Sequence, residues 1–195
     1  MTKIKLSFYS IVAITLFFLS CKKDEQTKED VTPVVSKTDS LRASTSGHFT
    51  FYGFKEGKVV EVGDSATTKW DFAIRLATII VNSQSSGPGN VGVITESGSF
   101  DSYTTAPESG YVYDTASSKL AINSTMSTGW FNYDPGTHSF SPKAGMFFVF
   151  KTTDNKYVKM EMLSARYEDF VGPMPSFIWH KFRYVYQPDG SREFE

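Results

Sequence analysis

Hydrophobic and polar residues alternate with a period of two along several stretches of this chain, as they do in β-strands that bury one face. In residues 69–81 the two faces of the expected strand are Trp70, Phe72, Ile74 and Leu76 on one side, and Asp71, Ala73 and Arg75 on the other. The same alternation recurs in residues 157–163, where the two methionines share a face with Val158, and in residues 177–186. Each stretch predicts a half-buried strand.

Turn-forming sequences separate these stretches. They are "NYDPGTHSF" (132–140), "TTDNKY" (152–157) and "QPDGSRE" (187–193), in which Asn or Gly tolerates a positive φ angle. Helical signals are sparse, and only a short helical turn is expected after Pro107. The pattern predicts a mostly β domain, a single antiparallel unit built of sequential hairpins.

The first residues differ from the rest of the chain. Lys3 and Lys5 precede an uncharged, mostly apolar run that ends at Ser20 and Cys21. This is the pattern of a secretory signal peptide, and Cys21 is the one cysteine of the chain. We expect residues 1–20 to be a lipoprotein signal peptide and Cys21 to carry the lipid that attaches the protein to a membrane.

Residues 21–46 are charged, rich in Ser and Thr, and free of aromatic residues. Such a composition buries little apolar surface, so a flexible tether is expected there. Residues 47–195 are then expected to form the single β domain, a length ordinary for one domain. Of the seventeen Phe residues of the chain, all but Phe8, Phe17 and Phe18 lie in this range and supply material for its core.

Charge and motifs exclude several classes of function. Removing residues 1–20 takes two lysines from the 20 basic residues and none from the 21 acidic ones, leaving a net charge of about −3. Nucleic-acid binding, which favours a strongly basic face, is therefore not expected. No Gly-x-Ser-x-Gly motif occurs, and "SSGPGNVG" lacks the Gly-Lys-Ser/Thr of a phosphate-binding loop. The sequence does not predict an enzyme.

The three histidines have no spacing typical of a zinc site. His48 and His180 are interpreted as strand residues, whereas His138 is either a surface residue of a turn or a ligand. Met126 lies in a polar segment and not in a core pattern, so its thioether is available as a soft ligand.

The order of several motifs resembles the HmuY family of haem-binding lipoproteins from Bacteroidetes. The motifs are "TKWDFAIR", "SSGPGNVGV", "GWFNYDPGTHSFSPKAG", "FFVFKTTDNKYVKMEMLS" and "FRYVYQPDG", and the resemblance runs from about Phe49 to Gly190. It implies an all-β, HmuY-like fold and a carrier that captures haem and passes it to a TonB-dependent outer-membrane receptor. "CKKDE" also resembles the export tag of surface lipoproteins in Bacteroidetes, which implies an outer-membrane protein facing the extracellular side.

The resemblance also implies a haem site with two axial ligands, which are histidines in some members and methionines in others. The second histidine falls near Tyr133 and Asp134 of this chain. The candidate axial ligands here are Met126 and His138. The candidate pocket residues are Trp130, Phe131, Tyr133, Asp134 and Phe140, and the candidate partners of the haem propionates are Lys119 and Lys143.

An alternative function uses no haem. Trp130, Phe131 and Tyr133, if exposed on a β-platform, would stack on sugar rings and make the protein a glycan-binding surface lipoprotein. Binding that depends on Met126 and His138 would favour haem, because iron needs a soft or imidazole donor and a sugar does not.

Overall fold

The computed structural model describes residues 33–168 and 175–195. The expected signal peptide, Cys21 and the first part of the expected tether lie outside these residues. The described part is nearly all β, and the one helix in it is a short 3-10 turn, η1 (Val62–Asp64). The predicted mostly β, antiparallel fold is confirmed. No helix within 33–168 or 175–195 has the length and apolar character needed to cross a membrane.

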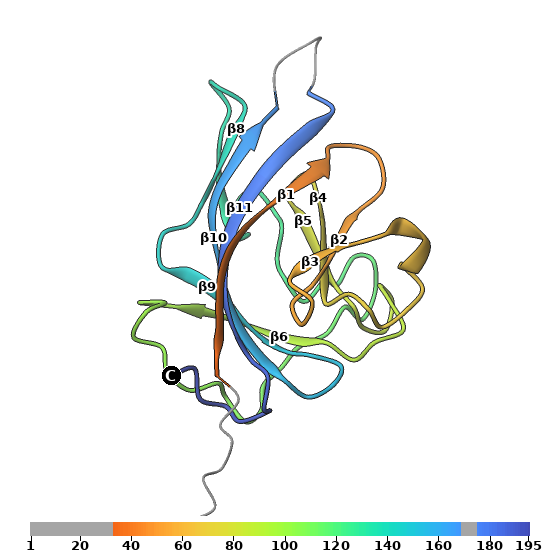
Figure 1. The fold of residues 1–195 in the computed structure, drawn as a ribbon. Helices are drawn as coiled ribbons and strands as arrows, with labels where there is room; N and C mark the ends of the chain where they lie inside the picture. Colours follow the sequence, from red (N-terminus) through yellow and green to blue (C-terminus); the bar gives the residue numbers. More distant parts are fainter. Residues whose placement is uncertain (1–32, 169–174) are drawn as a thin grey trace, which may run out of the picture. The chain divides into compact units, whose positions relative to one another are not determined.

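The largest sheet has five antiparallel strands in the order β1-β11-β10-β9-β6. Their bounds are β1 (Val35–Ser44), β6 (Gly92–Ser97), β9 (Met146–Lys151), β10 (Tyr157–Tyr167) and β11 (Phe177–Gln187). A bulge between Met162 and Ser164 shifts the register of β10 against β11. The long strands β10 and β11 run through the centre of this sheet (Figure 1).

Two smaller sheets complete the fold. One has the order β3-β2-β4-β5, and the other is the β7-β8 hairpin. The bounds are β2 (Thr50–Gly53), β3 (Lys58–Val60), β4 (Phe72–Arg75), β5 (Thr78–Val81), β7 (Phe131–Asp134) and β8 (Ser139–Pro142). Strand β8 lies beside the part of β10 that continues beyond its pairing with β9 (Figure 1).

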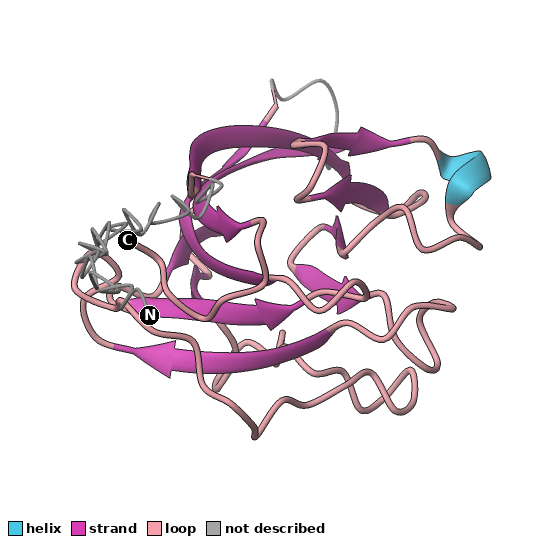
Figure 2. Ribbon diagram, turned by 60° about the horizontal axis from the view of Figure 1, so that its bottom comes forward, coloured by secondary structure: helices cyan, strands magenta, loops and turns pink. Residues whose placement is uncertain are grey.

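The large sheet and the β2–β5 sheet pack face to face (Figure 2) and share one hydrophobic core. Tyr52, Phe54 and Phe72 meet Phe182 and Tyr184 of β11 in this core. Burying such large rings is the main stabilising contribution of the fold. The expected buried face is confirmed in β10, where Val158, Met160 and Met162 are all buried, and in β11, where Ile178, His180, Phe182 and Tyr184 are buried. The opposite face of β10 is not fully exposed as expected, because Lys159 on it is also buried.

The tether prediction is wrong for residues 35–44, which form β1 at the edge of the large sheet. All ten residues pair with β11, and Leu41 and Ala43 are buried in the core. The sequence of this segment does not indicate a strand, because Leu41 and Ala43 are its only buried residues. Its other side chains are exposed or half-buried. Pairing with a long partner strand, and not local hydrophobicity, orders this segment.

The single strand expected over residues 69–81 is also wrong, because the chain reverses at Leu76 and Ala77 to make the β4-β5 hairpin. Leu76 has a φ angle of 51°. Its backbone N–H donates to Ser44 O at 2.9 Å, which ties the turn to the end of β1. The alternation predicts that Trp70 shares a face with Phe72. In the structure Trp70 instead packs with Phe51 in a separate cluster.

Of the three predicted turns, two connect paired strands. Asn155, with a φ angle of 58°, lies in the β9-β10 turn, and residues 135–138 join β7 to β8. "QPDGSRE" follows β11 and does not form a hairpin, although Gly190 has the expected positive φ angle of 89°. No helical turn follows Pro107.

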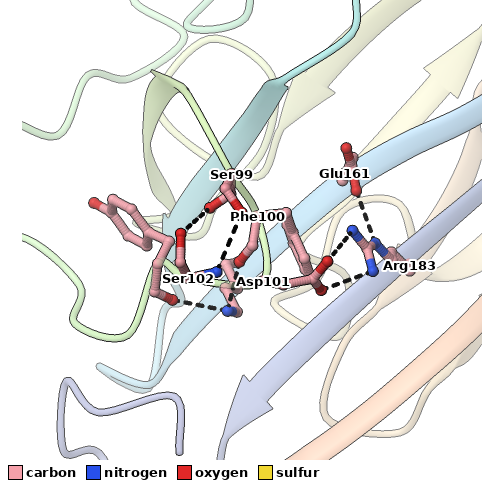
Figure 3. A network of polar contacts seen from close by, with 8 residues as sticks. Ser99, Phe100, Asp101, Ser102, Glu161 and Arg183 are labelled. Atoms are coloured by element: carbon pink, nitrogen blue, oxygen red, sulfur yellow. Dashed lines mark hydrogen bonds and ion pairs between the residues drawn. The ribbon is translucent and has the colours of Figure 1, made fainter.

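The outer face of the large sheet is partly covered by residues 99–103 (Figure 3). Asp101 accepts a hydrogen bond from Arg183 at 2.9 Å, and Glu161 accepts another at 2.7 Å. The buried Lys159 donates from Nζ to the carbonyl oxygens of Phe100 and Tyr103 at 2.8 and 2.7 Å. Burial lowers the pKa of Lys159. These contacts anchor a loop, and we assign this polar cluster a structural role.

Candidate functional site

The β7-β8 hairpin contains most of the candidate site residues. Tyr133 pairs with Phe140 and Asp134 with Ser139 across it. Asp134 shapes the turn, because its two carboxylate oxygens accept hydrogen bonds from the Gly136 N–H and the Thr137 hydroxyl, each at 2.8 Å. These bonds lower the pKa of Asp134. Its carboxylate is thus committed to the turn.

His138 ends this turn with a positive φ angle of 53°, an unusual conformation for a residue other than glycine. Its ring is exposed, and its Nδ1 lies 2.7 Å from the hydroxyl oxygen of Tyr133. When Nδ1–H donates to this oxygen, the lone pair of Nε2 is free and points away from the bond. A histidine held in this way by its other nitrogen is typical of metal-binding sites.

Three of the candidate aromatic residues lie in the core and not on the surface. Trp130 and Phe131 are each 2% exposed, and Phe140 is also buried. Trp130 donates from Nε1 to Ala77 O at 2.8 Å, which joins the start of the hairpin to the β4-β5 turn. The prediction of an exposed aromatic platform is therefore wrong for Trp130 and Phe131. They support the hairpin from beneath.

The aromatic cluster reaches the surface through two half-buried tyrosines. The rings of Tyr133 and Tyr167 lie 5.2 and 5.9 Å from the ring of Phe140. Tyr167, the last residue of β10, was not predicted as a site residue. The alternation in "YVKMEML" does not extend to it, because the bulge after Met162 changes the phase of the strand.

Met126 lies in a short, hydrogen-bonded loop just before the hairpin, and its side chain is 66% exposed. Asn123 Oδ1 accepts from the Thr125 N–H at 2.9 Å, and the Gly129 N–H donates to Thr125 O at 2.8 Å. A Cβ atom at Gly129 would lie 2.4 Å from Thr125 O, so only glycine fits there. The loop therefore presents a thioether to solvent from a defined backbone.

The loop and the hairpin both contact the β4-β5 hairpin. Ile79 N–H donates to Ser124 Oγ at 3.3 Å, next to the bond between Trp130 and Ala77 O. The buried His180 lies 2.7 Å from Leu76 O through Nε2, and its Nδ1 has no partner among the described residues. Burial lowers the pKa of His180 to about 4, so this imidazole is neutral and structural at pH 7.

The two candidate lysines lie in different places. Lys143 directly follows β8, is half-buried, and donates its backbone N–H to Trp130 O at 3.0 Å. Lys119 is exposed in a separate turn that begins at Ala116. Only Lys143 is tied to the β7-β8 hairpin by a described contact.

The donors available near the hairpin are an exposed thioether and an exposed imidazole. Within residues 33–168 and 175–195, no group of three or more His, Cys, Asp or Glu side chains is arranged to hold a metal ion. A thioether and an imidazole are each able to serve as one axial ligand of a metal cofactor.

Comparisons with known proteins agree with the fold. The family model described as HmuY protein matches residues 46–179. The crystal structure of an apo HmuY analog from Tannerella forsythia has a TM-score of 0.54 and 16% identity, and the match covers 82% of this chain and all of that one. A search of curated proteins gives no significant match.

Two further solved structures are more distant. One is described as an HmuY-like heme-binding protein from Bacteroides vulgatus, with 18% identity, a TM-score of 0.46, and coverage of 77% of this chain and 92% of that one. The other is described as a lipoprotein from Bacteroides fragilis, with 12% identity, a TM-score of 0.43, and coverage of 74% and 89%.

Proposed function

Because the chain belongs to the HmuY family, with the family model matching residues 46–179, we propose that it is a haem-binding lipoprotein. The proposed site is the end of the domain formed by the β7-β8 hairpin and the Met126 loop. The observation that supports this site most directly is the exposed pair of soft and imidazole donors, Met126 and His138, on the two segments that flank Trp130.

The chemistry of these donors fits haem iron. Thioether and imidazole are both established axial ligands of haem. His138 is oriented by the Tyr133 hydroxyl, and Met126 is presented by a loop that Gly129 keeps compact. Either residue would supply an axial ligand without displacing a core side chain.

The surroundings offer contacts for the rest of the macrocycle. Tyr133 and Tyr167 are half-buried and present ring surface above Phe140. Lys143, at the end of β8, is the candidate partner for a propionate. Trp130, Phe131 and Phe140 keep the hairpin in place from the core side and do not themselves wall a slot.

We further propose that the protein is a carrier and not an enzyme. A lipid on Cys21 would anchor it to the outer membrane, facing the extracellular side, and haem would pass from it to a TonB-dependent receptor. The pattern of Lys3, Lys5 and the apolar run before Cys21 supports the anchor. An exposed site suits transfer, because a receptor can reach both axial donors.

The test is a haem titration of the chain that starts at residue 22, followed by visible absorption spectra with the iron oxidised and reduced. A saturable one-to-one shift of the Soret band with sharp visible bands is the expected result. A weak change that does not saturate would contradict the proposal. The alternative glycan-binding function has lost its main support, because Trp130 and Phe131 are buried.

A further inference from the structure

A cavity of about 770 Å³ lies at the other end of the long strands from the β7-β8 hairpin. It is bounded by the β2-β3 hairpin, by residues 61–71 and by the β9-β10 turn, with Tyr186 of β11 on its wall. Tyr157, at this end of β10, pairs with Gln187, whereas Tyr167, at the opposite end, contacts Phe140. The cavity is therefore separate from the proposed haem site.

A buried carboxylate lies in the wall of this cavity. Asp71 is 9% exposed, and its Oδ2 accepts a hydrogen bond from the Phe54 N–H at 2.7 Å. Its Oδ1 has no hydrogen-bond partner among the described residues. Because this oxygen is not fully buried, it is free to accept a hydrogen bond from a ligand in the cavity.

A second polar group lines the same cavity. Tyr186 is 5% exposed, and its hydroxyl, like Asp71 Oδ1, forms no hydrogen bond with any residue in the described part of the chain. A phenol oxygen can accept a hydrogen bond as well as donate one. Asp71 and Tyr186 thus offer two hydrogen-bond acceptors in the same cavity.

The electrostatics of the cavity favour a cation. Burial, together with the charge of Asp154, raises the pKa of Asp71 to about 7. Burial also raises the pKa of Tyr186 to about 12, with contributions from Asp154, Asp71 and Glu56. Five carboxylates line the cavity against three lysines, and they are Glu56, Glu61, Asp64, Asp71 and Asp154. Of the lysines that line the cavity, Lys69 is paired with Asp64 at 2.9 Å, and Lys55 and Lys58 are exposed.

The lining suits an organic cation better than a metal ion, since the described residues hold no cluster of three metal-ligating side chains. A metal ion needs several oxygen ligands at short distances, whereas an ammonium group needs only hydrogen-bond acceptors. Val59 and Val60 of β3 also line the cavity, and because neighbouring side chains of a strand point to opposite faces, one of the two offers its side chain as apolar surface for a methylene chain. A volume of this size is typical of small-molecule sites.

We propose that this cavity binds the primary ammonium group of a small organic cation. Asp71 Oδ1 and the Tyr186 hydroxyl oxygen accept hydrogen bonds from the ammonium, and a valine side chain of β3 contacts the alkyl chain attached to it. The site is independent of haem binding, because none of its residues belongs to the hairpin or to the Met126 loop.

The test is isothermal titration of the full mature chain with 1,5-diaminopentane at pH 8, where Asp71 is mostly ionised. The uncharged control ligand is 1,5-pentanediol, which has the same chain length. An ionic strength of about 0.15 M screens exposed charges beyond ~8 Å and so suppresses loose surface binding. We expect saturable binding of the diamine and none of the diol.

Two variants locate the bound ligand. Asp71→Asn keeps an oxygen for the Phe54 N–H but removes the charge, and should weaken diamine binding about ten- to hundredfold. Tyr186→Phe should weaken it less. Asp101→Asn, in the polar cluster on the outer face of the large sheet, is the matched control and should leave the affinity unchanged.

Equal binding of diol and diamine would overturn the proposal in favour of a polyol site. Absence of any diamine binding, or binding that Asp71→Asn does not weaken, would also overturn it. Circular dichroism and an unchanged haem titration of Asp71→Asn would show that the variant is folded, and would separate the outcome at this cavity from that at the hairpin.

Discussion

The hydroxyl oxygen of Tyr133 lies 2.7 Å from Nδ1 of His138, and the two residues flank the β7-β8 turn on opposite sides. The rings are tilted by 49°, with centroids 6.2 Å apart. This contact orients the one exposed imidazole of the hairpin through Nδ1, and no described residue forms a hydrogen bond with its Nε2. The hydrogen bond is thus the feature that turns a residue of a tight turn into a candidate ligand.

Replacing Tyr133 by Phe should therefore weaken haem binding without removing a ligand. Loss of a residue that orients a metal-binding histidine typically lowers the affinity about ten- to hundredfold. Haem titration of Tyr133→Phe measures this, with Tyr103→Phe as the control, because Tyr103 bonds Glu96 on the other side of the fold. An affinity equal to that of the parent would show that Tyr133 does not position His138.

The double variant Met126→Ala, His138→Ala should lose the six-coordinate haem spectrum altogether. Both side chains are exposed, so their truncation should leave the stability within about 0.5 kcal/mol of the parent. His48→Ala, at an exposed histidine outside the hairpin, is the matched control. Unchanged absorption of the double variant would reject these two residues as axial ligands.

Gly129→Ala should disrupt the loop that presents Met126. The added Cβ would lie 2.4 Å from Thr125 O, a backbone atom that cannot move aside without opening the loop. We expect a loss of about 1–3 kcal/mol in the free energy of unfolding, measured by urea denaturation. Gly63→Ala is the control, because nothing lies within 4 Å of its added Cβ. Equal stability of the two variants would contradict the close packing at Gly129.

His180 should make the protein less stable in acid. Its pKa is about 4 in the folded protein, against an ordinary value of 6.5, so the unfolded chain binds more protons between these two values. The free energy of unfolding should fall as the pH drops from 6.5 to 4, by on the order of 3 kcal/mol. Glutamine at position 180 keeps a donor for Leu76 O and should flatten this slope, whereas His48→Gln should retain it. Parallel curves for parent and His180→Gln would be inconsistent with a buried neutral imidazole.

Asp71 should have the opposite effect. Its pKa is about 7 in the folded protein against 3.8 ordinarily, so the folded state binds more protons in this range and loses stability as the pH rises from 4 to 7. Relative to the parent, Asp71→Asn should gain on the order of 4 kcal/mol across this interval. Asp154, Glu56 and Tyr186 face the same cavity and are present in both proteins, so the difference between the two unfolding curves reports Asp71. A constant difference would mean that Asp71 is ionised in the fold at low pH.

The sequence alone predicted those features that depend on neighbouring residues. Alternation identified the buried faces of β10 and β11, because successive side chains of a strand point to opposite faces. Turn chemistry identified the β7-β8 and β9-β10 hairpins. The exposure of Met126 and His138 also followed from their polar surroundings.

Features that depend on distant residues were decided by the tertiary structure. Strand β1 has few apolar residues of its own and is ordered by pairing with β11. The turn at Leu76 has no glycine or asparagine, and contacts with Ser44, Trp130 and His180 hold it in place instead. The residue pattern within one segment does not reveal partners that lie far away in the sequence.

The same reason explains the site residues. The sequence suggested that Trp130 is part of an exposed aromatic platform. In the structure its indole N–H donates a hydrogen bond to Ala77 O inside the core. The cavity at Asp71 combines segments near residues 55–71, 152–154 and 186, which no spacing in the sequence connects. The sequence therefore determined the β class, the buried faces of the long strands β10 and β11 and the candidate donors, and the packing of distant segments decided where β1 and the β4-β5 turn form and which side chains are buried.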